Sequence, residues 1–430
     1  MVKVCVLGLG YIGLPTASMF ATHGLEVVGV DVNQAVVKTL NGGDIHIEEP
    51  GLKTVVQAAI KSGNLRVTTC PESADAFIIA VPTPINADKT ADMRYVTSAA
   101  ESIVPHLRQG NLVILESTSP PRTTVDLVRP ILERSGLKAG QDFSLAYSPE
   151  RVLPGQILRE LVENSRVIGG IDRASAEAGR DLYATFVQGE IVLTDATTAE
   201  MVKLMENTYR DINIAIANEF ARLADRFGVN VWEAIAIANR HPRVKILQPG
   251  PGVGGHCISV DPWFFVEAAP DVAKLIHQAR LVNDGQPAYV VAKLRETLGD
   301  LRGRTFAALG VTYKPDVDDI RESPAIEVVH LLREAGAVVR VFDPYVKNNG
   351  DLAELLVDSV EAAATGAEGL LLLVQHREFL KVDVARLAQV MARPTAAARP
   401  FVFDTRNVLD HQAWRAAGFE VLLLGAASES

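Results

Sequence analysis

The 430-residue chain is too long for one compact core and indicates roughly two or three domains. Hydrophobic residues make up 48% and charged residues 22%, which is typical of a water-soluble globular protein, and no apolar run is long enough to predict a membrane span. The net charge of −10 argues against a nucleic-acid-binding protein, and three widely spaced cysteines argue against a disulfide framework and favour a reducing cytoplasm.

The first 190 residues alternate between strand-like and helix-like segments. The strand-like runs are Lys3–Leu7, Val27–Val30, Ala76–Val81, Leu112–Glu116 and Ser144–Tyr147. Continuous apolar strands joined by helical crossovers predict a parallel sheet with helices on both faces.

The first strand runs into the sequence GLGYIG (8–13), a GxGxxG pattern directly before a helix. Gly8, Gly10 and Gly13 permit a tight turn, a close approach of backbone to a pyrophosphate and tight helix packing. The second strand ends at Asp31, whose carboxylate can accept hydrogen bonds from ribose hydroxyls and would repel a 2′-phosphate. The pattern therefore predicts NAD as the cofactor; the alternative is a glycine turn with an Asp that only caps a loop.

Polar loops follow three further strands of the predicted sheet. Thr83 and Thr118 lie in two of these loops, where they are either cofactor contacts or ordinary turn residues. Glu150 and Arg151 follow the third strand and could present a carboxylate to water and a cation to phosphate. The carboxyl ends of parallel strands line the ligand crevice of such folds.

The character of the sequence changes from about Thr197 to Leu298, where helical periodicity replaces alternation. The predicted helices are Ala199–Phe227, Trp232–Asn239, Val272–Asn283 and one beginning at Ala288. Lys203, Asn207 and Arg210 lie on one face of the first of these helices, so they could face an anionic or carbonyl-bearing ligand. The alternative is a solvated polar stripe.

The sequence PGPGVGGHC (249–257) predicts a loop, because its glycines and prolines suit neither a helix nor a strand. Such a loop brings N–H groups close to a ligand and can favour a thiolate, so Cys257 is either a nucleophile or a buried structural thiol. Cys5 lies in a predicted strand and is expected to be inert, and His256 is expected to be structural. The basic cluster RHPR (240–243) precedes the loop and suits a pyrophosphate.

Strands return in the last part of the chain, at Arg304–Val311, Val338–Phe342, Gly369–Val374 and Phe401–Asp404. Helical segments separate them, which predicts a second doubly wound domain. The expected plan is α/β: two Rossmann-like domains, residues 1–196 and 299–430, joined by a central all-helical region, residues 197–298.

Taken together, several sequence blocks resemble the UDP-glucose/GDP-mannose dehydrogenase family over nearly the whole chain. The blocks are GLGYIGLP (8–15), VPTP (81–84), ESTSPP (116–121), SPERVLPG (148–155), AEMVKLMENTYRDINIA (199–215), NRHPRV (239–244), GPGVGGHC (250–257) and YKPDVDDIRESPA (313–325). The blocks around Glu150 and Cys257 look more like the N-acetyl-hexosamine branch than the UDP-glucose branch. Ser119 departs from many relatives, which puts only its local geometry in doubt.

The resemblance implies a set of site residues. Expected catalytic residues are Cys257 as nucleophile, Lys203 as general acid/base, Asn207 as an oxyanion- or water-orienting group, and Glu150 and Asp261 as carboxylates that position water. Expected NAD contacts are Gly8, Gly10, Tyr11, Ile12, Gly13, Asp31, Thr83, Thr118 and Arg321. Expected substrate contacts are Arg151, Val152, Lys203, Asn207, Arg210, His241, Arg243, Gly254 and Lys314. No metal site is expected.

The activity that the resemblance implies is four-electron oxidation of a UDP-sugar alcohol to a carboxylate, through a thiohemiacetal and a thioester on the cysteine. The expected substrate is UDP-N-acetyl-D-mannosamine, with UDP-N-acetyl-D-glucosamine and then UDP-glucose as alternatives. A two-electron hydroxyacid-type dehydrogenase and a non-catalytic nucleotide-binding protein are the competing classes. The resemblance also suggests a homodimer, with the basic cluster reaching across it, and a role in cell-surface polysaccharide synthesis.

Overall fold

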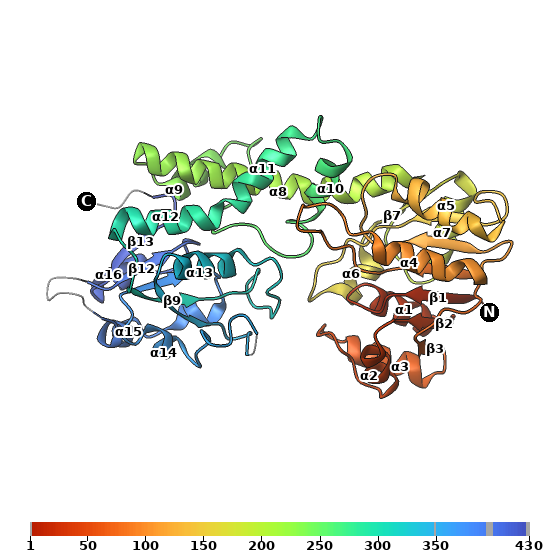
Figure 1. Cartoon of the computed structure of the whole chain (residues 1–430), viewed down its shortest axis with the longest axis horizontal. Coiled ribbons are helices and arrows are strands. Elements are labelled where there is room, and N and C mark those ends of the chain that lie inside the picture. Colours follow the sequence, from red (N-terminus) through yellow and green to blue (C-terminus); the bar gives the residue numbers. More distant parts are fainter. Residues whose placement is uncertain (1, 348–349, 393–398, 427–430) are drawn as a thin grey trace. The chain divides into compact units, whose positions relative to one another are not determined.

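The computed structural model of the chain describes residues 2–347, 350–392 and 399–426 (Figure 1). The chain divides into two compact units, one made of Met1–Glu206 and Trp263–Val272 and the other of Asn207–Pro262 and Ala273–Ser430. Within the described ranges, every helix is too short or too polar to cross a membrane.

The N-terminal unit is built on an eight-stranded sheet in the order β3-β2-β1-β4-β5-β6-β7-β8. Its strands are β1 (Lys3–Leu7), β2 (Glu26–Val30), β3 (Leu65–Thr68), β4 (Ala76–Ile79), β5 (Leu112–Leu115), β6 (Ser144–Tyr147), β7 (Arg166–Gly170) and β8 (Ile191–Asp195). Its helices are α1 (Gly13–Thr22), α2 (Gln34–Asn41), α3 (Leu52–Lys61), α4 (Arg94–Ile103), α5 (Arg129–Leu132), α6 (Ile157–Glu163) and α7 (Arg173–Tyr183), with short turns η1 (Val104–His106), η2 (Thr124–Val128) and η3 (Glu133–Ser135).

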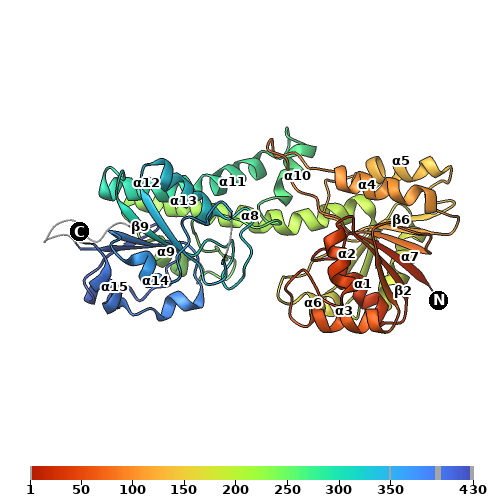
Figure 2. The ribbon, with the colours of Figure 1, turned by 60° about the horizontal axis from the view of Figure 1, so that its bottom comes forward.

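Two hydrophobic layers cover this sheet. Helices α1, α3 and α6 lie on one face and α4 and α5 on the other (Figure 2). Leu14 and Phe20 are fully buried on the first side, and Ile103 and Leu132 on the second. Since apolar strand residues are buried on both faces, β1, β4 and β5 are continuous hydrophobic runs rather than alternating ones.

The sheet is not purely parallel, which corrects the sequence prediction. β7 runs antiparallel to β6 through the pairs Ala146–Gly170 and Tyr147–Gly169. A side chain at Gly169 would overlap the carbonyl oxygen of Asp195, so the glycine lets β7 pass close to its neighbours. β3, β7 and β8 were absent from the prediction.

The C-terminal unit is built on a parallel five-stranded sheet in the order β10-β9-β11-β12-β13. Its strands are β9 (Thr305–Leu309), β10 (Val338–Phe342), β11 (Gly369–Leu372), β12 (Phe401–Asp404) and β13 (Glu420–Leu423). Its helices are α9 (Val231–Ala238), α11 (Lys274–Asp284), α12 (Gln286–Leu298), α13 (Pro324–Glu334), α14 (Val360–Ala364), α15 (Val384–Val390) and α16 (His411–Ala416), with the turn η4 (Arg377–Lys381). α12 and α13 pack on one face of the sheet and α14, α15 and α16 on the other (Figure 1). The predicted fold class, with two Rossmann-like sheets and a helical central region, is confirmed.

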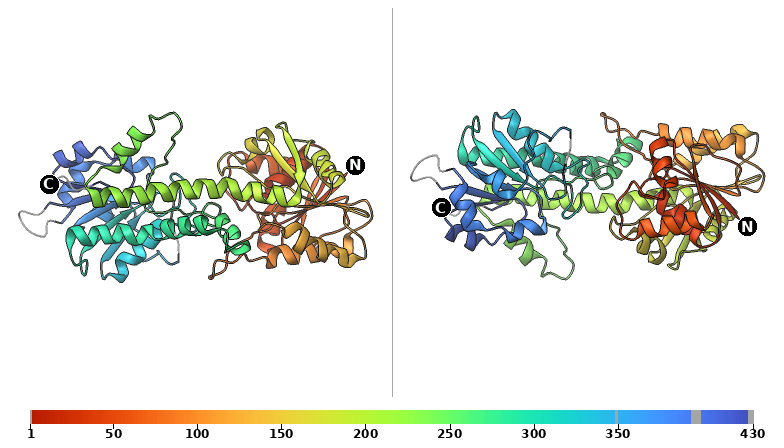
Figure 3. Two further views of the ribbon diagram at one scale, coloured as in Figure 1. Left: turned by 90° about the horizontal axis from the view of Figure 1, so that it is seen from above. Right: turned by 90° about the horizontal axis from the view of Figure 1, so that it is seen from below.

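Two helices belong partly to each unit. α8 (Ala196–Phe227) is one uninterrupted helix of 32 residues (Figure 3). α10 (Asp261–Ala268) was not predicted, and its later residues belong to the N-terminal unit. Glu267 at its end accepts a hydrogen bond from the N–H of Ala91 at 2.8 Å, which ties α10 to the loop after β4.

Candidate active site

The glycine turn after β1 is tightly packed at Gly8 and Gly13 and unobstructed at Gly10. A side chain at Gly13 would overlap the carbonyl oxygen of Gly8, and one at Gly8 (φ 93°) would lie 2.5 Å from the oxygen of Ala80. At Gly10, by contrast, a Cβ would meet no atom within 4 Å. The first turn of α1 carries no acidic residue, so its N-terminal N–H groups are suited to a phosphate.

Asp31, the residue after β2, is hydrogen-bonded to the backbone of this turn. Its Oδ2 accepts from Leu9 N at 3.0 Å and its Oδ1 from Asn33 N at 2.9 Å, while Gly8 N donates to Val30 O at 2.8 Å. The carboxylate remains half-exposed, and each oxygen keeps a lone pair for a ribose hydroxyl. The residues present therefore fit NAD.

The loops after β4 and β5 lie beside each other at the carboxyl edge of the same sheet. Ser117 Oγ donates to Val81 O at 2.7 Å, which joins the two loops. Thr83 and Thr118 are both half-buried there. Ser119 is fully buried and bonds the carbonyl of Ser117 at 2.9 Å, so the local geometry around it is well packed. The remaining predicted contacts of this edge, Tyr11, Ile12 and Val152, are also half-buried.

Glu150 does not lie open to water as its position in the sequence suggested. It is buried, with a carboxylate that is ion-paired with Arg166 and also accepts from Arg151 N at 2.7 Å. Arg166 also donates to Glu116 at 3.2 Å and stacks on Tyr183, 4.1 Å from the ring centre. A buried guanidinium requires buried counter-charges, which explains why Glu150 turns inward.

Glu116 is the less accessible of the two carboxylates in this cluster. Burial raises the pKa of Glu116 to about 7; Arg166 opposes the rise and Glu150 adds to it. Tyr183 donates its hydroxyl to Glu116 at 2.8 Å, and burial raises the pKa of Tyr183 well above its ordinary value. Sequence reasoning missed Arg166, although an arginine at the start of an apolar strand is a signal for a buried ion pair.

The face of α8 that carries Lys203 and Asn207 is not a solvated stripe. Lys203 is only 9% exposed, and Asn207, one helical turn on, is half-buried. Asn207 Nδ2 donates to Asp261 Oδ2 at 2.6 Å, which fixes the side-chain carbonyl oxygen of Asn207 away from that carboxylate. Asp261 is 2% exposed and is the first residue of α10, where a carboxylate is favoured by the helix dipole.

Cys257 lies on the bend that leads into α10. Its carbonyl oxygen accepts from Asp261 N at 2.8 Å and from Val260 N at 3.1 Å, so the thiol-bearing residue is anchored to the start of the helix. The side chain is half-buried, whereas Cys5 is fully buried and burial raises its pKa to about 11. The structure therefore leaves Cys257 partly accessible and Cys5 inert.

The glycine loop before Cys257 is held at both ends. Gly250 N donates to the side chain of Asn218 on α8 at 2.9 Å, a contact that sequence reasoning missed. Gly255 N donates to Arg321 O at 3.1 Å, and a side chain at Gly255 (φ 85°) would lie 2.8 Å from the ring of Tyr313. A side chain at Gly254 would overlap the carbonyl oxygen of Glu322. Only glycine permits these close approaches.

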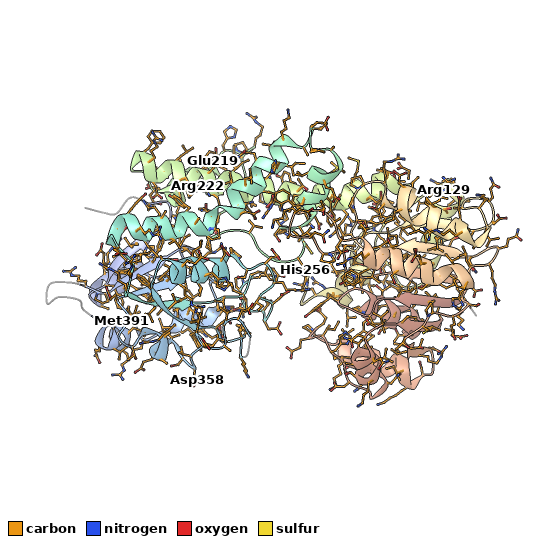
Figure 4. The ribbon with its side chains drawn as sticks, in the orientation of Figure 1. Arg129, Glu219, Arg222, His256, Asp358 and Met391 are labelled. Carbon is orange, nitrogen blue, oxygen red and sulfur yellow. The ribbon has the colours of Figure 1, made fainter. Side chains whose placement is uncertain are left out.

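His256, labelled in Figure 4, has a partner that its sequence context did not reveal. Its Nδ1 lies 3.8 Å from the carboxylate of Asp319, which also pairs with Arg321 at 2.6 Å. Burial raises the pKa of Asp319, but the hydrogen bonds from Arg321 and the charges of Arg321 and His256 outweigh burial and lower it. Arg321, a predicted cofactor contact, thus lies beside the glycine loop that precedes Cys257, within the C-terminal unit.

The other predicted substrate contacts differ in exposure and in partners. Arg151 is engaged by Glu206 at 2.7 Å and by the carbonyl of Ser165. Arg210, His241 and Arg243 are exposed, and Lys314 is half-buried in the loop after β9.

Models of one protein family match the chain in three consecutive segments. All belong to the UDP-glucose/GDP-mannose dehydrogenase family: its NAD binding domain matches residues 2–187, its central domain residues 197–285 and its UDP binding domain residues 307–411.

Individual relatives agree with the family models. The chain is 50% identical over 429 residues to a UDP-N-acetyl-D-mannosamine dehydrogenase of Methanococcus maripaludis, covering 98% of this chain and 97% of the relative. It is 50% identical over 393 residues to an NDP-N-acetyl-D-galactosaminuronic acid dehydrogenase of Ralstonia nicotianae, covering 89% and 93% of the two chains. The solved structure of a UDP-D-ManNAc dehydrogenase from Pyrococcus horikoshii matches with a TM-score of 0.91 and 42% identity, over 99% of this chain and 100% of that one. The chain thus belongs to the UDP-glucose/GDP-mannose dehydrogenase family and is an NAD-dependent dehydrogenase of nucleotide sugars.

Proposed function

We propose that the protein oxidises the C6 hydroxyl of UDP-N-acetyl-D-mannosamine to a carboxylate, by way of a covalent adduct on Cys257. The observation that carries the chemistry is the position of Cys257 four residues before Asp261. The carboxylate of Asp261 is bonded to Asn207, and Asn207 lies one helical turn from Lys203 on α8. The substrate assignment is supported by the 50% identity to the Methanococcus maripaludis protein of that name.

Each residue of this group has a chemical part in the proposed reaction. NAD, when bound, supplies the hydride acceptor for two successive two-electron oxidations. Lys203 takes the proton of the C6 hydroxyl, because a mostly buried amine can exchange a proton with a bound alcohol out of contact with bulk water. The Cys257 thiolate then adds to the C6 aldehyde and makes the carbon tetrahedral, so that it can lose a second hydride and become a thioester.

Release of the acid requires water and a place for negative charge. Water attacks the thioester, the C–S bond breaks, and the thiolate of Cys257 is restored. Asn207, held by Asp261, is placed on α8 to donate to or orient groups near Lys203, and we assign it to the oxyanion. Asp261 or Glu150 accepts the proton of the attacking water. Asp261 is the better supported of the two, because the carboxylate of Glu150 is bound by Arg166.

We assign NAD binding to residues 1–196, the helical core to 197–298 and UDP binding to 299–430, which the family-model matches support. A row of five exposed apolar residues on α8 supports a homodimer. They are Tyr209 (67% exposed), Ile216 (41%), Phe220 (38%), Leu223 (42%) and Phe227 (72%). Their spacing places them along one side of the helix, where a second copy would cover them. The three cysteines are few and widely spaced in the sequence, which supports a reducing compartment, the cytoplasm.

A different N-acetylated sugar is the second candidate, because the Ralstonia nicotianae relative, also 50% identical, is named for an N-acetyl-galactosaminuronic acid. The two relatives differ in the sugar and share the nucleotide-sugar chemistry, so the choice depends on the sugar pocket.

The experiment that tests the proposal is a count of NADH formed per sugar consumed. Purified protein is incubated with NAD and, separately, with UDP-N-acetylmannosamine, UDP-N-acetylgalactosamine, UDP-N-acetylglucosamine and UDP-glucose. Two NADH per UDP-N-acetylmannosamine, with a uronate product, is the expected result. Two NADH with another sugar alone would change the assigned substrate and leave the proposed mechanism intact. One NADH with an aldehyde or ketone product would overturn the role of Cys257.

A further inference from the structure

The C-terminal sheet repeats a backbone clamp of the N-terminal sheet. Gly310 (φ 84°) follows β9 and its N–H donates to Phe342 O at 2.9 Å. Val311 N then donates to Asp343 Oδ2 at 2.7 Å, and Tyr345 N to Asp343 Oδ1 at 2.9 Å. Contact by contact, this is the arrangement of the glycine turn and Asp31 described above.

The next strand in each sheet, β4 beside β1 and β11 beside β9, extends the correspondence. Leu7 of β1 pairs with Ile79 of β4, and Leu309 of β9 pairs with Leu372 of β11. Thr83 lies four residues beyond Ile79, and His376 lies four residues beyond Leu372. His376 therefore occupies the counterpart of a loop that faces the NAD crevice in the first sheet.

His376 fills this position with a completely buried imidazole. Its Nε2 lies 3.0 Å from Asp343 Oδ2, and its Nδ1 accepts from Asp316 N at 2.9 Å. These two contacts require the neutral tautomer with its proton on Nε2. The rings of Tyr345 and Phe379 pack against the imidazole, with centroids 5.0 and 5.3 Å away. Whereas Asp31 is half-exposed, Asp343 is 4% exposed and its carboxylate is taken up within the protein.

The contact to Asp316 fixes the turn that carries Lys314. Asp316 has a φ of 60°, in the left-handed region that costs energy for a residue other than glycine. Its N–H is held by His376 and its carboxylate by Arg377, at 2.6 Å from Nε. Within the turn, Thr312 Oγ1 donates to Lys314 O at 2.9 Å and lies 3.2 Å from His376 Nε2.

We propose that His376 is a positioning residue for the nucleotide end of the substrate. It fills the crevice at the carboxyl ends of the second sheet, beside Asp343. It also holds the turn 312–316 so that the Lys314 ammonium meets the diphosphate. The inference rests on the proposed function, in which residues 299–430 bind UDP, and on the sequence prediction that Lys314 contacts the substrate. It assigns to His376 no contact with the reacting atoms.

Two amide substitutions separate the two contacts of the imidazole. In His376→Asn the amide oxygen can replace Nδ1 and accept from Asp316 N, whereas in His376→Gln the amide nitrogen can replace Nε2 and donate to Asp343. We expect UDP to bind about tenfold more weakly to His376→Ala, because a buried N–H that holds the turn loses its acceptor. The Asn variant should recover most of this loss and the Gln variant little of it. His330→Ala, a half-buried histidine on α13, is the matched control.

The measurement is calorimetric titration of the full chain with UDP and, separately, with NAD, together with KM and kcat for the UDP-sugar. NAD affinity and kcat should stay near wild type while KM rises with the UDP dissociation constant. In a Lys314→Met background, His376→Ala should have little further effect on UDP affinity. A folded His376→Ala protein that binds UDP like wild type would overturn the positioning role, and equal behaviour of the Asn and Gln variants would overturn it as well. Wild-type protein that fails to bind UDP would overturn the proposed function itself, so the two failures are distinguishable.

Discussion

Arg166 lies between the buried carboxylates of Glu116 and Glu150, and one guanidinium can neutralise only one of them. The pKa of Glu116 is raised by burial to about 7, from an ordinary value of 4.5. A carboxyl group with a higher pKa in the folded state takes up a proton on folding. Glu116 therefore costs increasing stability as the pH rises from 4.5 to about 7.

We expect Glu116→Gln to remove this dependence, because glutamine is neutral and keeps an oxygen for the hydroxyl of Tyr183. The free energy of unfolding of the wild type should fall relative to the variant by up to about 1.4 kcal/mol per pH unit across the window. Urea unfolding at several pH values measures the difference. Glu101→Gln, at a solvent-exposed position, should run parallel to wild type; parallel curves for Glu116→Gln as well would show that Glu116 is ionised throughout.

Cys257 is the residue on which the four-electron reaction depends. In Cys257→Ser, the hydroxyl is a far weaker nucleophile and its ester hydrolyses differently from a thioester, so the second oxidation should stall. We expect NADH per sugar to drop from two to one or below and a sugar adduct or aldehyde to accumulate. Mass spectrometry of the quenched protein and a count of NADH provide the measurement, with Cys70→Ser as the control. Full turnover by Cys257→Ser would exclude the covalent step.

At the scale of elements, α8 combines a polar face near its middle with an apolar side further on. Phe220 is 38% exposed in the single chain, and a charge there would face the partner in the proposed dimer. We expect Phe220→Asp to shift the protein to monomer in sedimentation or size-exclusion experiments, because burying an unpaired carboxylate is costly. Leu380→Asp, at a 52% exposed position on η4, should leave the assembly unchanged. An unchanged assembly for Phe220→Asp would place the interface elsewhere.

How far each element could be predicted depended on the strength of its pattern. β1, β6, β10 and β12 match the predicted strands to the residue, because each is a compact apolar run between polar or turn residues. β7 was missed because it begins at Arg166 and ends in two glycines. α10 was missed because its sequence, DPWFFVEA, lacks the periodic spacing of apolar residues that marks an amphipathic helix. Short elements of this kind are stabilised by tertiary packing rather than by their own pattern.

The residues of the candidate site also differed in how far the sequence could predict them. Motif residues such as Gly8, Asp31 and Cys257 could be proposed from the sequence because the motifs that contain them are contiguous. The partners of Glu150 and the role of His376 could not, because Arg166 and Asp316 approach them from distant strands and loops. Such contacts decide which carboxylate stays accessible to solvent and which is buried within the protein.

At the scale of the whole molecule, the chain uses one strand plan twice, and in the proposed function each copy binds a different ligand. We expect Asp31→Ala to weaken NAD binding about tenfold, because the ribose hydroxyls lose an ionic acceptor, and to leave UDP binding unchanged. Calorimetric titration with each nucleotide tests both halves of the statement. Asp44→Ala, an exposed aspartate of the same unit, is the control. Equal losses for NAD and UDP would mean that Asp31 supports the fold rather than the cofactor.

The two clamp aspartates should also differ in how evolution and mutagenesis treat them. Asp343 is buried, and its carboxylate bonds backbone N–H groups and the His376 imidazole, so its loss should lower the amount of protein that accumulates in the cell. Asp31 is half-exposed, so a protein without it should accumulate closer to the normal level and lose activity in proportion to its weaker NAD binding. A mutational library sorted once for abundance and once for activity would therefore separate two residues that hold the same place in the same motif.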